Sequence, residues 1–374
     1  MQHVAIINSR QALRPTGRDE WIQATLRAVH TLRTESNYRF LASLGETTYE
    51  LTLYEICRMK SHAEIVLTTG QLQALANSKE TLRNILADEF NLSSERMSFR
   101  CLETRQESSK QAQHLRDAEI LRRADIVVPV SIRPGGFWDT QLADSASLAG
   151  RIDNRFRVPY QKSHTRIKQS FVERRPLAAT ARRLENYLIH WTRTANGPWP
   201  GERRSEYYRA ICDSEQAYPR SSLATLERIL AEKRIRGSSR HMPQGAAMVS
   251  LTSASLAESI ALMKYRARYR EMTIEPYAIA LPSGLAKQSG IRQVTYLAEQ
   301  ELSQLSDTER LFAHAVGAEK TDWKREKEWR ADGDLDLSPV WSDLIVLTES
   351  DEQARRITKD YRLDAYATFA PVGQ

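Results

Sequence analysis

The chain has few cysteines and no long apolar run. Its 374 residues include three cysteines, Cys57, Cys101 and Cys212, which are far apart and odd in number. This pattern argues against a disulfide framework and a cysteine-based zinc site, and we expect no bound metal. No stretch approaches the roughly 18 consecutive apolar residues of a membrane-spanning helix. Residues 1–8 lack the basic start and long apolar core of a signal peptide, so we expect a cytoplasmic protein without a membrane partner.

Two common nucleotide-binding signatures are also missing. The sequence contains neither the G-x-G-x-x-G fingerprint nor a phosphate-loop lysine, so ordinary dinucleotide or ATP chemistry is not indicated. It shows no internal repeat. Its length predicts two domains, and its composition, 41% hydrophobic and 27% charged, is that of a globular protein with a core.

The N-terminal part alternates short apolar runs with amphipathic stretches. The runs cover residues 4–8, 39–45, 63–67, 97–102 and 124–130. The last is apolar enough for a central parallel strand. Strand and helix alternating in this way predict a doubly wound α/β fold, Rossmann-like, over residues 1–150.

Small and basic residues follow several of these runs. Gly135 and Gly136 come after the last strand and just before a helix, where backbone N–H groups can approach a phosphate. The alternative is that the two glycines only make a tight turn. Loops after parallel strands meet at one edge of the sheet, where α/β folds bind ligands. The candidate nucleotide-binding residues at that edge are Ser9, Arg10, Ser43, Gly45, Arg133, Gly135 and Gly136.

These loops carry a resemblance to a known group. Ser9-Arg10, Ser43-Leu44-Gly45 and Arg133-Pro134-Gly135-Gly136 are similar to motifs of the Rossmann-like group that joins the DNA-processing (Smf-type) proteins and the Lonely Guy phosphoribohydrolases. The phosphoribohydrolases continue with a further glycine and a spaced glutamate, which this chain lacks after Gly136. The resemblance therefore implies a bound nucleotide more than hydrolysis. A nucleotide N-glycosidase remains an alternative, and it predicts release of free base.

A basic connector follows, over residues 151–183. From residue 151 to residue 185 there are ten basic and three acidic residues, a difference of seven that equals the net charge of the whole chain, +7. Such a concentration can bind phosphates of nucleic acid. The alternative is a solvated link between domains.

Many short strands and fewer helices predict an α+β second domain over residues 184–374. Near its end, residues 324–330 are expected to form an exposed edge strand that carries Glu326 and Glu328 on one face, because side chains two apart on a strand share a face. A paired carboxylate face can stabilise a developing cation and activate a nucleophile. It can also be a solvated charged rim.

Two earlier strands supply hydroxyl and imidazole groups. Residues 188–192 carry His190 and Thr192, and residues 247–252 carry Ser250 and Thr252. The alternatives are that His190 is a satisfied core histidine and Ser250 a small strand residue. A helix-like run over 265–270 is expected to place Tyr265 and Tyr269 on one face; such a pair is more often part of a core.

The ordered triple His-x-Thr, Ser-x-Thr and Glu-x-Glu resembles the ADP-ribosyltransferase family, including toxin and phage-defence members. The resemblance covers about residues 184–350. It implies NAD as substrate, with Glu328 as catalytic carboxylate and Glu326 acting on the acceptor. It also implies that NAD is contacted by side chains of the two earlier strands, which are His190, Thr192, Ser250 and Thr252. Tyr265 and Tyr269 are candidates for stacking on nicotinamide.

Two functions of different classes follow. The first is an ADP-ribosyltransferase or NAD glycohydrolase coupled to a nucleotide-binding domain. The second is a non-enzymatic protein that binds a nucleotide or a single-stranded nucleic acid through the connector; its binding would depend strongly on salt. A homo-oligomer is compatible with both.

Overall fold

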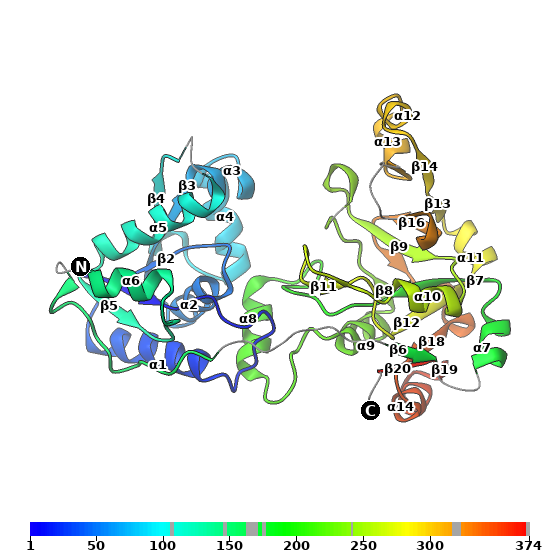
Figure 1. Cartoon of the computed structure of the whole chain (residues 1–374), viewed down its shortest axis with the longest axis horizontal. Coiled ribbons are helices and arrows are strands. Elements are labelled where there is room, and N and C mark those ends of the chain that lie inside the picture. The colour runs from blue at the N-terminus through cyan, green and yellow to red at the C-terminus, as the bar shows by residue number, and fades with distance from the viewer. Residues whose placement is uncertain are drawn as a thin grey trace. The chain divides into compact units, whose positions relative to one another are not determined.

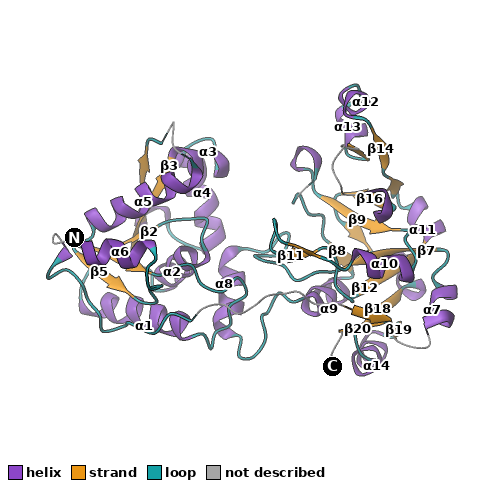
Figure 2. Ribbon diagram, in the orientation of Figure 1, coloured by secondary structure: helices purple, strands orange, loops and turns teal. Residues whose placement is uncertain are grey.

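The computed structural model describes residues 1–104, 108–144, 148–161, 171–173, 177–240, 242–315 and 323–371. These residues form two compact units (Figures 1 and 2). Unit 1 comprises residues 1–165 and 202–219, and unit 2 comprises residues 166–201 and 220–374. Part of the basic connector, residues 162–170 and 174–176, lies outside the described residues.

Unit 1 contains a five-stranded parallel sheet flanked by helices, as the alternating pattern predicts. Its order is β4-β3-β2-β1-β5. The strands are β1 (His3–Ile7), β2 (Arg39–Ala42), β3 (His62–Thr68), β4 (Met97–Leu102) and β5 (Ile126–Pro129). The order reverses at β1, so the loops after β1 and β5 leave the carboxyl edge side by side, where open α/β sheets bind ligands.

Helices cover both faces of this sheet. They are α1 (Glu20–Glu35), α2 (Thr47–Arg58), α3 (Thr69–Leu75), α4 (Lys79–Phe90), the 3-10 turn η1 (Ser94–Arg96), α5 (Ser109–Arg123), α6 (Phe137–Asp144) and α8 (Arg204–Asp213). Val4 and Ile6 of β1 pack in a cluster with α1 and α2. Ala5 and Ile7 pack on the other side with α5 and α6. Because successive strand residues face opposite sides, an unbroken apolar strand needs both layers.

The helix α8 belongs to unit 1, although the domain ranges expected from the sequence place it in the C-terminal domain. Its Tyr207, Tyr208 and Ile211 are buried in the core of unit 1. Tyr208 also donates a 3.0 Å hydrogen bond to Glu50 of α2. A local sequence pattern gives the amphipathic helix but not the surface on which it packs.

Unit 2 is built on a seven-stranded mixed sheet with the order β13-β16-β9-β7-β12-β18-β19. Neighbouring strands are antiparallel except β18 and β19, which are parallel. The strands are β7 (Tyr187–Trp191), β9 (Met248–Thr252), β12 (Ala278–Pro282), β13 (Arg292–Gln293), β16 (Glu328–Asp332), β18 (Ile345–Thr348) and β19 (Asp364–Ala367). β16 and β9 are paired over five residues, whereas β9 and β7 share the single pair Ile189–Thr252.

The remaining elements of unit 2 cover this sheet or extend from it. The helices are α7 (Leu177–Arg183), α9 (Ser222–Glu232), α10 (Leu256–Leu262), α11 (Ser283–Gln288), α12 (Glu299–Ser303), α13 (Asp307–Arg310) and α14 (Asp351–Tyr361). The 3-10 turns are η3 (Pro243–Gly245), η4 (Trp323–Glu326) and η5 (Ser338–Asp343). Short strands form the pairs β10 (Tyr265–Arg266) with β11 (Glu271–Met272), β14 (Thr295–Leu297) with β15 (Ala313–Ala315), β17 (Leu335–Asp336) with β8 (Arg234–Ile235), and β20 (Phe369–Pro371) with β6 (Phe171–Glu173).

Three expectations about local structure in unit 2 are wrong. The strand predicted over 324–330 begins only at Glu328; Glu326 lies in η4, and Lys327 between them has φ +42°. β16 is not an edge strand, because β13 pairs with its outer side. Residues 265–272 form a hairpin instead of a helix, with a turn that ends at Arg270 (φ +55°), so Tyr265 and Tyr269 do not share a helical face.

Candidate functional site

The best-defined acidic site of unit 2 lies where β16 pairs with β9. Ser250 Oγ donates a 2.8 Å hydrogen bond to Glu328 Oε1. Nε and Nη2 of Arg330 each donate to one Glu328 carboxylate oxygen at 2.9 Å. Three hydrogen bonds therefore fix the orientation of this carboxylate, which is 13% exposed.

The strand register explains this arrangement. Ser250 lies opposite Arg330, and Thr252 lies opposite Glu328. Paired residues of an antiparallel ladder point to the same face of the sheet. Arg330 is itself buried and donates Nη1 to the backbone oxygens of Leu311 at 2.8 Å and Ala313 at 3.4 Å.

Glu326 is the second acid of the site, although it is not on the strand. Its Oε1 accepts a 2.9 Å bond from Nη2 of Arg266 in the β10–β11 hairpin. Burial and the charge of Glu328 raise the pKa of Glu326, while Arg266 acts in the opposite direction. A raised pKa makes an ionised carboxylate a stronger proton acceptor.

His190 reaches the same strand from the other side of the sheet. Its neighbours Ile189 and Trp191 pack in one hydrophobic layer, whereas Leu188 packs in the opposite layer with Leu251. Alternation along β7 therefore directs His190 to the face opposite that of Glu328. Its Nδ1 lies 2.8 Å from the backbone oxygen of Ser250, so Ser250 contacts both groups. Burial lowers the pKa of His190, and nearby Arg193 adds to this shift, which favours a neutral imidazole at pH 7.

Basic side chains gather near the end of β7. Arg193 and Arg240 form ion pairs with buried Glu271 at 3.4 Å and 2.9 Å. Burial lowers the pKa of Arg193; the charges of Arg240 and Arg266 add to this shift, and those of Glu271 and Glu275 oppose it. Two buried carboxylates therefore face the two cations, and an anionic ligand here would compete with them.

The other predicted NAD contacts occupy different settings. Thr192 is buried and donates its hydroxyl to the backbone oxygens of Ser222 (2.9 Å) and Tyr277 (3.1 Å), so that hydroxyl already has acceptors. Thr252 donates to the backbone oxygen of Glu326 and thereby holds η4 against β9. Tyr265 and Tyr269 are half-buried on the hairpin.

Four of the predicted residues of unit 1 meet where the strand order reverses. The backbone N–H of Ser9 donates to Ser131 at 2.9 Å, and Ser9 Oγ accepts from the backbone N–H of Arg133 at 2.9 Å. Gly135 has φ +67°, and Gly136 closes the turn onto the carbonyl of Arg133 at 3.0 Å. The loops after β1 and β5 are thus joined directly.

The N–H groups of the candidate glycines, Gly135, Gly136 and Gly45, already have acceptors in the chain, and that of Gly136 is the Arg133 carbonyl. Gly135 donates to Asp139 Oδ2 and Gly45 to Glu50 Oε1, both at 2.9 Å. Arg10 forms a two-point pair with Glu46, at 2.8 and 3.2 Å. Ser43 is buried and donates to the backbone oxygen of Val66. An anionic ligand at these groups would have to replace carboxylates of the protein.

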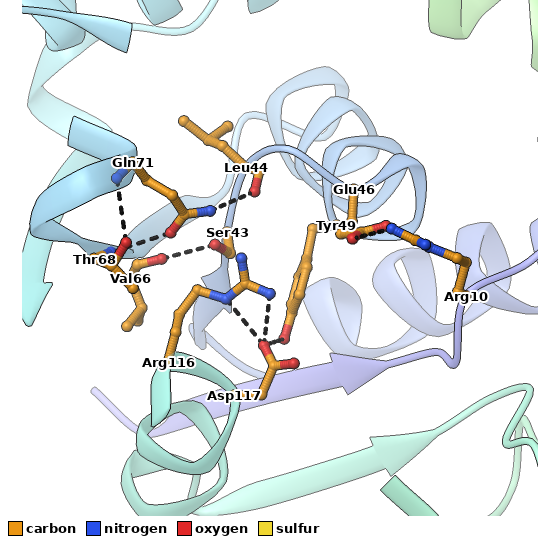
Figure 3. Close-up of polar contacts among 10 residues, drawn as sticks. All are labelled: Arg10, Ser43, Leu44, Glu46, Tyr49, Val66, Thr68, Gln71, Arg116 and Asp117. Atoms are coloured by element: carbon orange, nitrogen blue, oxygen red, sulfur yellow. Dashed lines mark hydrogen bonds and ion pairs between the residues drawn. The ribbon is translucent and has the colours of Figure 1, made fainter. Parts of the chain in front are cut away.

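A buried guanidinium beneath this edge was missed by the sequence analysis. Arg116 of α5 is 2% exposed; its Nε and Nη2 donate to Asp117 at 2.9 and 2.8 Å, and Tyr49 donates to the same oxygen at 2.8 Å. Figure 3 shows the guanidinium between Ser43 and Tyr49, whose ring centroid is 5.0 Å away. Burial raises the pKa of Asp117, against the opposing influence of Arg116. Nη1 of Arg116 has no hydrogen-bond partner among the described residues.

A second contact holds the loop after β2 against the first turn of α3. Gln71 caps α3 together with Thr68, and its side-chain amide donates a 3.0 Å hydrogen bond to the backbone oxygen of Leu44 (Figure 3).

Arg116 in α5 gave a weak signal in the sequence, because a charged side chain on the sheet-facing side of an amphipathic helix needs a partner.

Comparison of the chain with family models, with curated proteins and with solved structures finds no match. Within the described ranges, no helix is long and apolar enough to cross a membrane. The described histidine, cysteine and acidic side chains include no group of three arranged to hold a metal ion.

Proposed function

We propose that unit 2 is an ADP-ribosyltransferase-like domain that cleaves the nicotinamide–ribose bond of NAD. The observation that carries the proposal is the Ser250–Glu328 hydrogen bond, which joins two motif residues that are 78 positions apart in the sequence. Glu328 would stabilise the positive charge that develops at C1′ of the ribose. Arg330 and Ser250 would hold its carboxylate in one orientation.

The other groups take supporting roles in this proposal. His190, neutral at pH 7, contacts the backbone oxygen of Ser250 and would position the strand that carries the Ser250 hydroxyl. Arg193 and Arg240 supply positive charge for the diphosphate, and Glu326 accepts the proton of the attacking group. Because His190 and Glu328 leave opposite faces of the sheet, we expect no single NAD molecule to contact both, and the proposal rests on Glu328, Ser250 and Arg330. Tyr265 and Tyr269 remain candidates for contact with nicotinamide.

The test is release of nicotinamide from NAD, followed by chromatography and mass spectrometry. Glu328→Gln should lower the rate by roughly 100-fold or more, because a charge-stabilising group at the reacting centre is lost. Glu352→Gln, at an exposed position of α14, is the matched control and should keep the wild-type rate. Equal rates in wild type and Glu328→Gln would contradict the assignment, as would no release with protein, nucleic-acid or water acceptors.

Unit 1 supports a second proposal, a Rossmann-like nucleotide-binding domain. The supporting observation is the buried Arg116 with an unpartnered Nη1 under the edge where the β1 and β5 loops meet. Binding should be measured by calorimetry with nucleoside mono-, di- and triphosphates. Arg116→Met should weaken nucleotide binding. Arg133→Met should also weaken it if the loop after β5 contacts the nucleotide. Release of free base from a monophosphate would instead identify an N-glycosidase. A role in toxicity or defence against phage rests on the resemblance of unit 2 alone.

A further inference from the structure

An arginine of the chain itself already occupies the carboxylate that would receive an acceptor. Nη2 of Arg266 lies 2.9 Å from Glu326 Oε1, and the two side chains are 27% and 26% exposed. Glu326 lies two residues before Glu328. The charge of Glu328 acts on Glu326, so the two carboxylates lie near each other. In the proposed function C1′ of NAD reacts at Glu328, which puts the Arg266 guanidinium near the reacting atom, and this guanidinium is not sealed from solvent.

The hairpin fixes Arg266 in this place. Arg266 pairs across the ladder with Glu271, and Glu271 is anchored by ion pairs with Arg193 and Arg240. A nucleophile held by its own backbone reacts in a unimolecular step, which gives it a large advantage over an acceptor in solution. The backbone stays in place, and rotation about the side-chain torsions of Arg266 turns the guanidinium from Glu326 toward C1′.

We propose that Arg266 is an acceptor of ADP-ribose, modified in cis by the same chain. The inference rests on the proposed function of unit 2. Glu326 takes a proton from the guanidinium, and the freed nitrogen electron pair forms a bond to C1′ of NAD. The bond between C1′ and the nicotinamide nitrogen breaks, nicotinamide leaves with that electron pair, and the proton passes from Glu326 to solvent.

The modification has a consequence for the site. The adduct adds bulk and two phosphate charges to the nitrogen that contacts Glu326, so the ion pair is lost and the carboxylate becomes open to an external acceptor. Modified protein should therefore transfer ADP-ribose to added agmatine or an arginine peptide faster than unmodified protein.

The experiment incubates the full chain with NAD and measures nicotinamide and protein adducts together. Cleavage after glutamate releases residues 259–271, which contain Arg266, Arg268 and Arg270, and fragmentation assigns the modified residue. The expected result is an adduct on Arg266 that is absent in Arg266→Lys and in Glu328→Gln. Arg268→Lys, at an exposed arginine of the same hairpin, is the control and should still be modified at Arg266.

A mixing experiment separates cis from trans transfer. Affinity-tagged Glu328→Gln chains with intact Arg266 are incubated with untagged wild-type chains, and only the wild-type chains should carry an adduct at position 266. Nicotinamide release without an adduct on Arg266, an equal adduct on Arg268, or labelling of the Glu328→Gln chain would overturn the inference while the proposed activity stands. No nicotinamide release at all would overturn both.

Discussion

The ion pair between Glu328 and Arg330 gives the sharpest prediction for stability. Arg330 is 4% and Glu328 13% exposed, and two 2.9 Å hydrogen bonds connect them. Glu328→Gln leaves the guanidinium charge buried without its carboxylate. Removing one partner of a buried pair typically costs about 3–5 kcal/mol. Arg330 keeps the backbone oxygens of Leu311 and Ala313, so we expect the lower end, about 3 kcal/mol.

The companion substitutions separate the pair from its surroundings. Arg330→Met also destabilises unit 2, because, in the part of the chain that the structure describes, the side-chain donor left to the Glu328 carboxylate is Ser250. In the double variant no lone buried charge remains. The sum of the two single losses in the free energy of unfolding should therefore exceed the loss in the double variant, and the difference, the coupling energy, should be about 1–3 kcal/mol. Glu352→Gln on the surface should change the free energy of unfolding by less than about 0.5 kcal/mol.

Urea unfolding followed by tryptophan fluorescence measures these changes. Five of the seven tryptophans lie in the ranges of unit 2, so the signal reports mainly on that unit. Losses that simply add in the double variant would refute the coupling. An unchanged midpoint in Glu328→Gln would refute the claim that the pair is buried and mutually dependent. The activity of Glu328→Gln must be measured without urea and at a temperature well below its unfolding transition.

Three further predictions concern single positions. Burial lowers the pKa of His190, so its protonation favours the unfolded state; stability of wild type should fall as pH decreases below about 6.5, and His190→Gln should flatten that dependence in unfolding curves. Gly237→Ala puts a Cβ 2.6 Å from a backbone oxygen and should cost about 1–3 kcal/mol in urea unfolding, whereas Gly284→Ala has no atom within 4 Å of its Cβ and should be neutral or stabilising. Tyr49→Phe removes the hydroxyl that donates to buried Asp117, and it should lower the free energy of unfolding of unit 1 by about 1–3 kcal/mol, measured as a lower melting temperature. An unchanged melting temperature would show that this hydrogen bond adds no net stability.

Local patterns in the sequence gave a good account of the elements. Apolar runs predicted all five parallel strands of unit 1. The central strands are apolar because they are buried on both faces, whereas the edge strand β4 is only half-buried and carries Ser98 and Arg100. The short strands that carry His190 and Ser250 were also found, although Thr192 lies just beyond β7 and Glu326 lies before β16. These features depend on residues that are neighbours in sequence, and side-chain periodicity records them.

The tertiary structure decided how distant groups meet. The sequence could not place Glu326 in a 3-10 turn, nor direct His190 and Glu328 to opposite faces, nor pair Arg266 with Glu326 across 60 positions. An arginine on the sheet-facing side of α5 indicated that a partner was needed, but the sequence did not identify Asp117 and Tyr49 as the groups around it. The physical reason is that burial, ion pairing and pKa shifts depend on distances in space, and residues remote in sequence set those distances only after the sheets have formed.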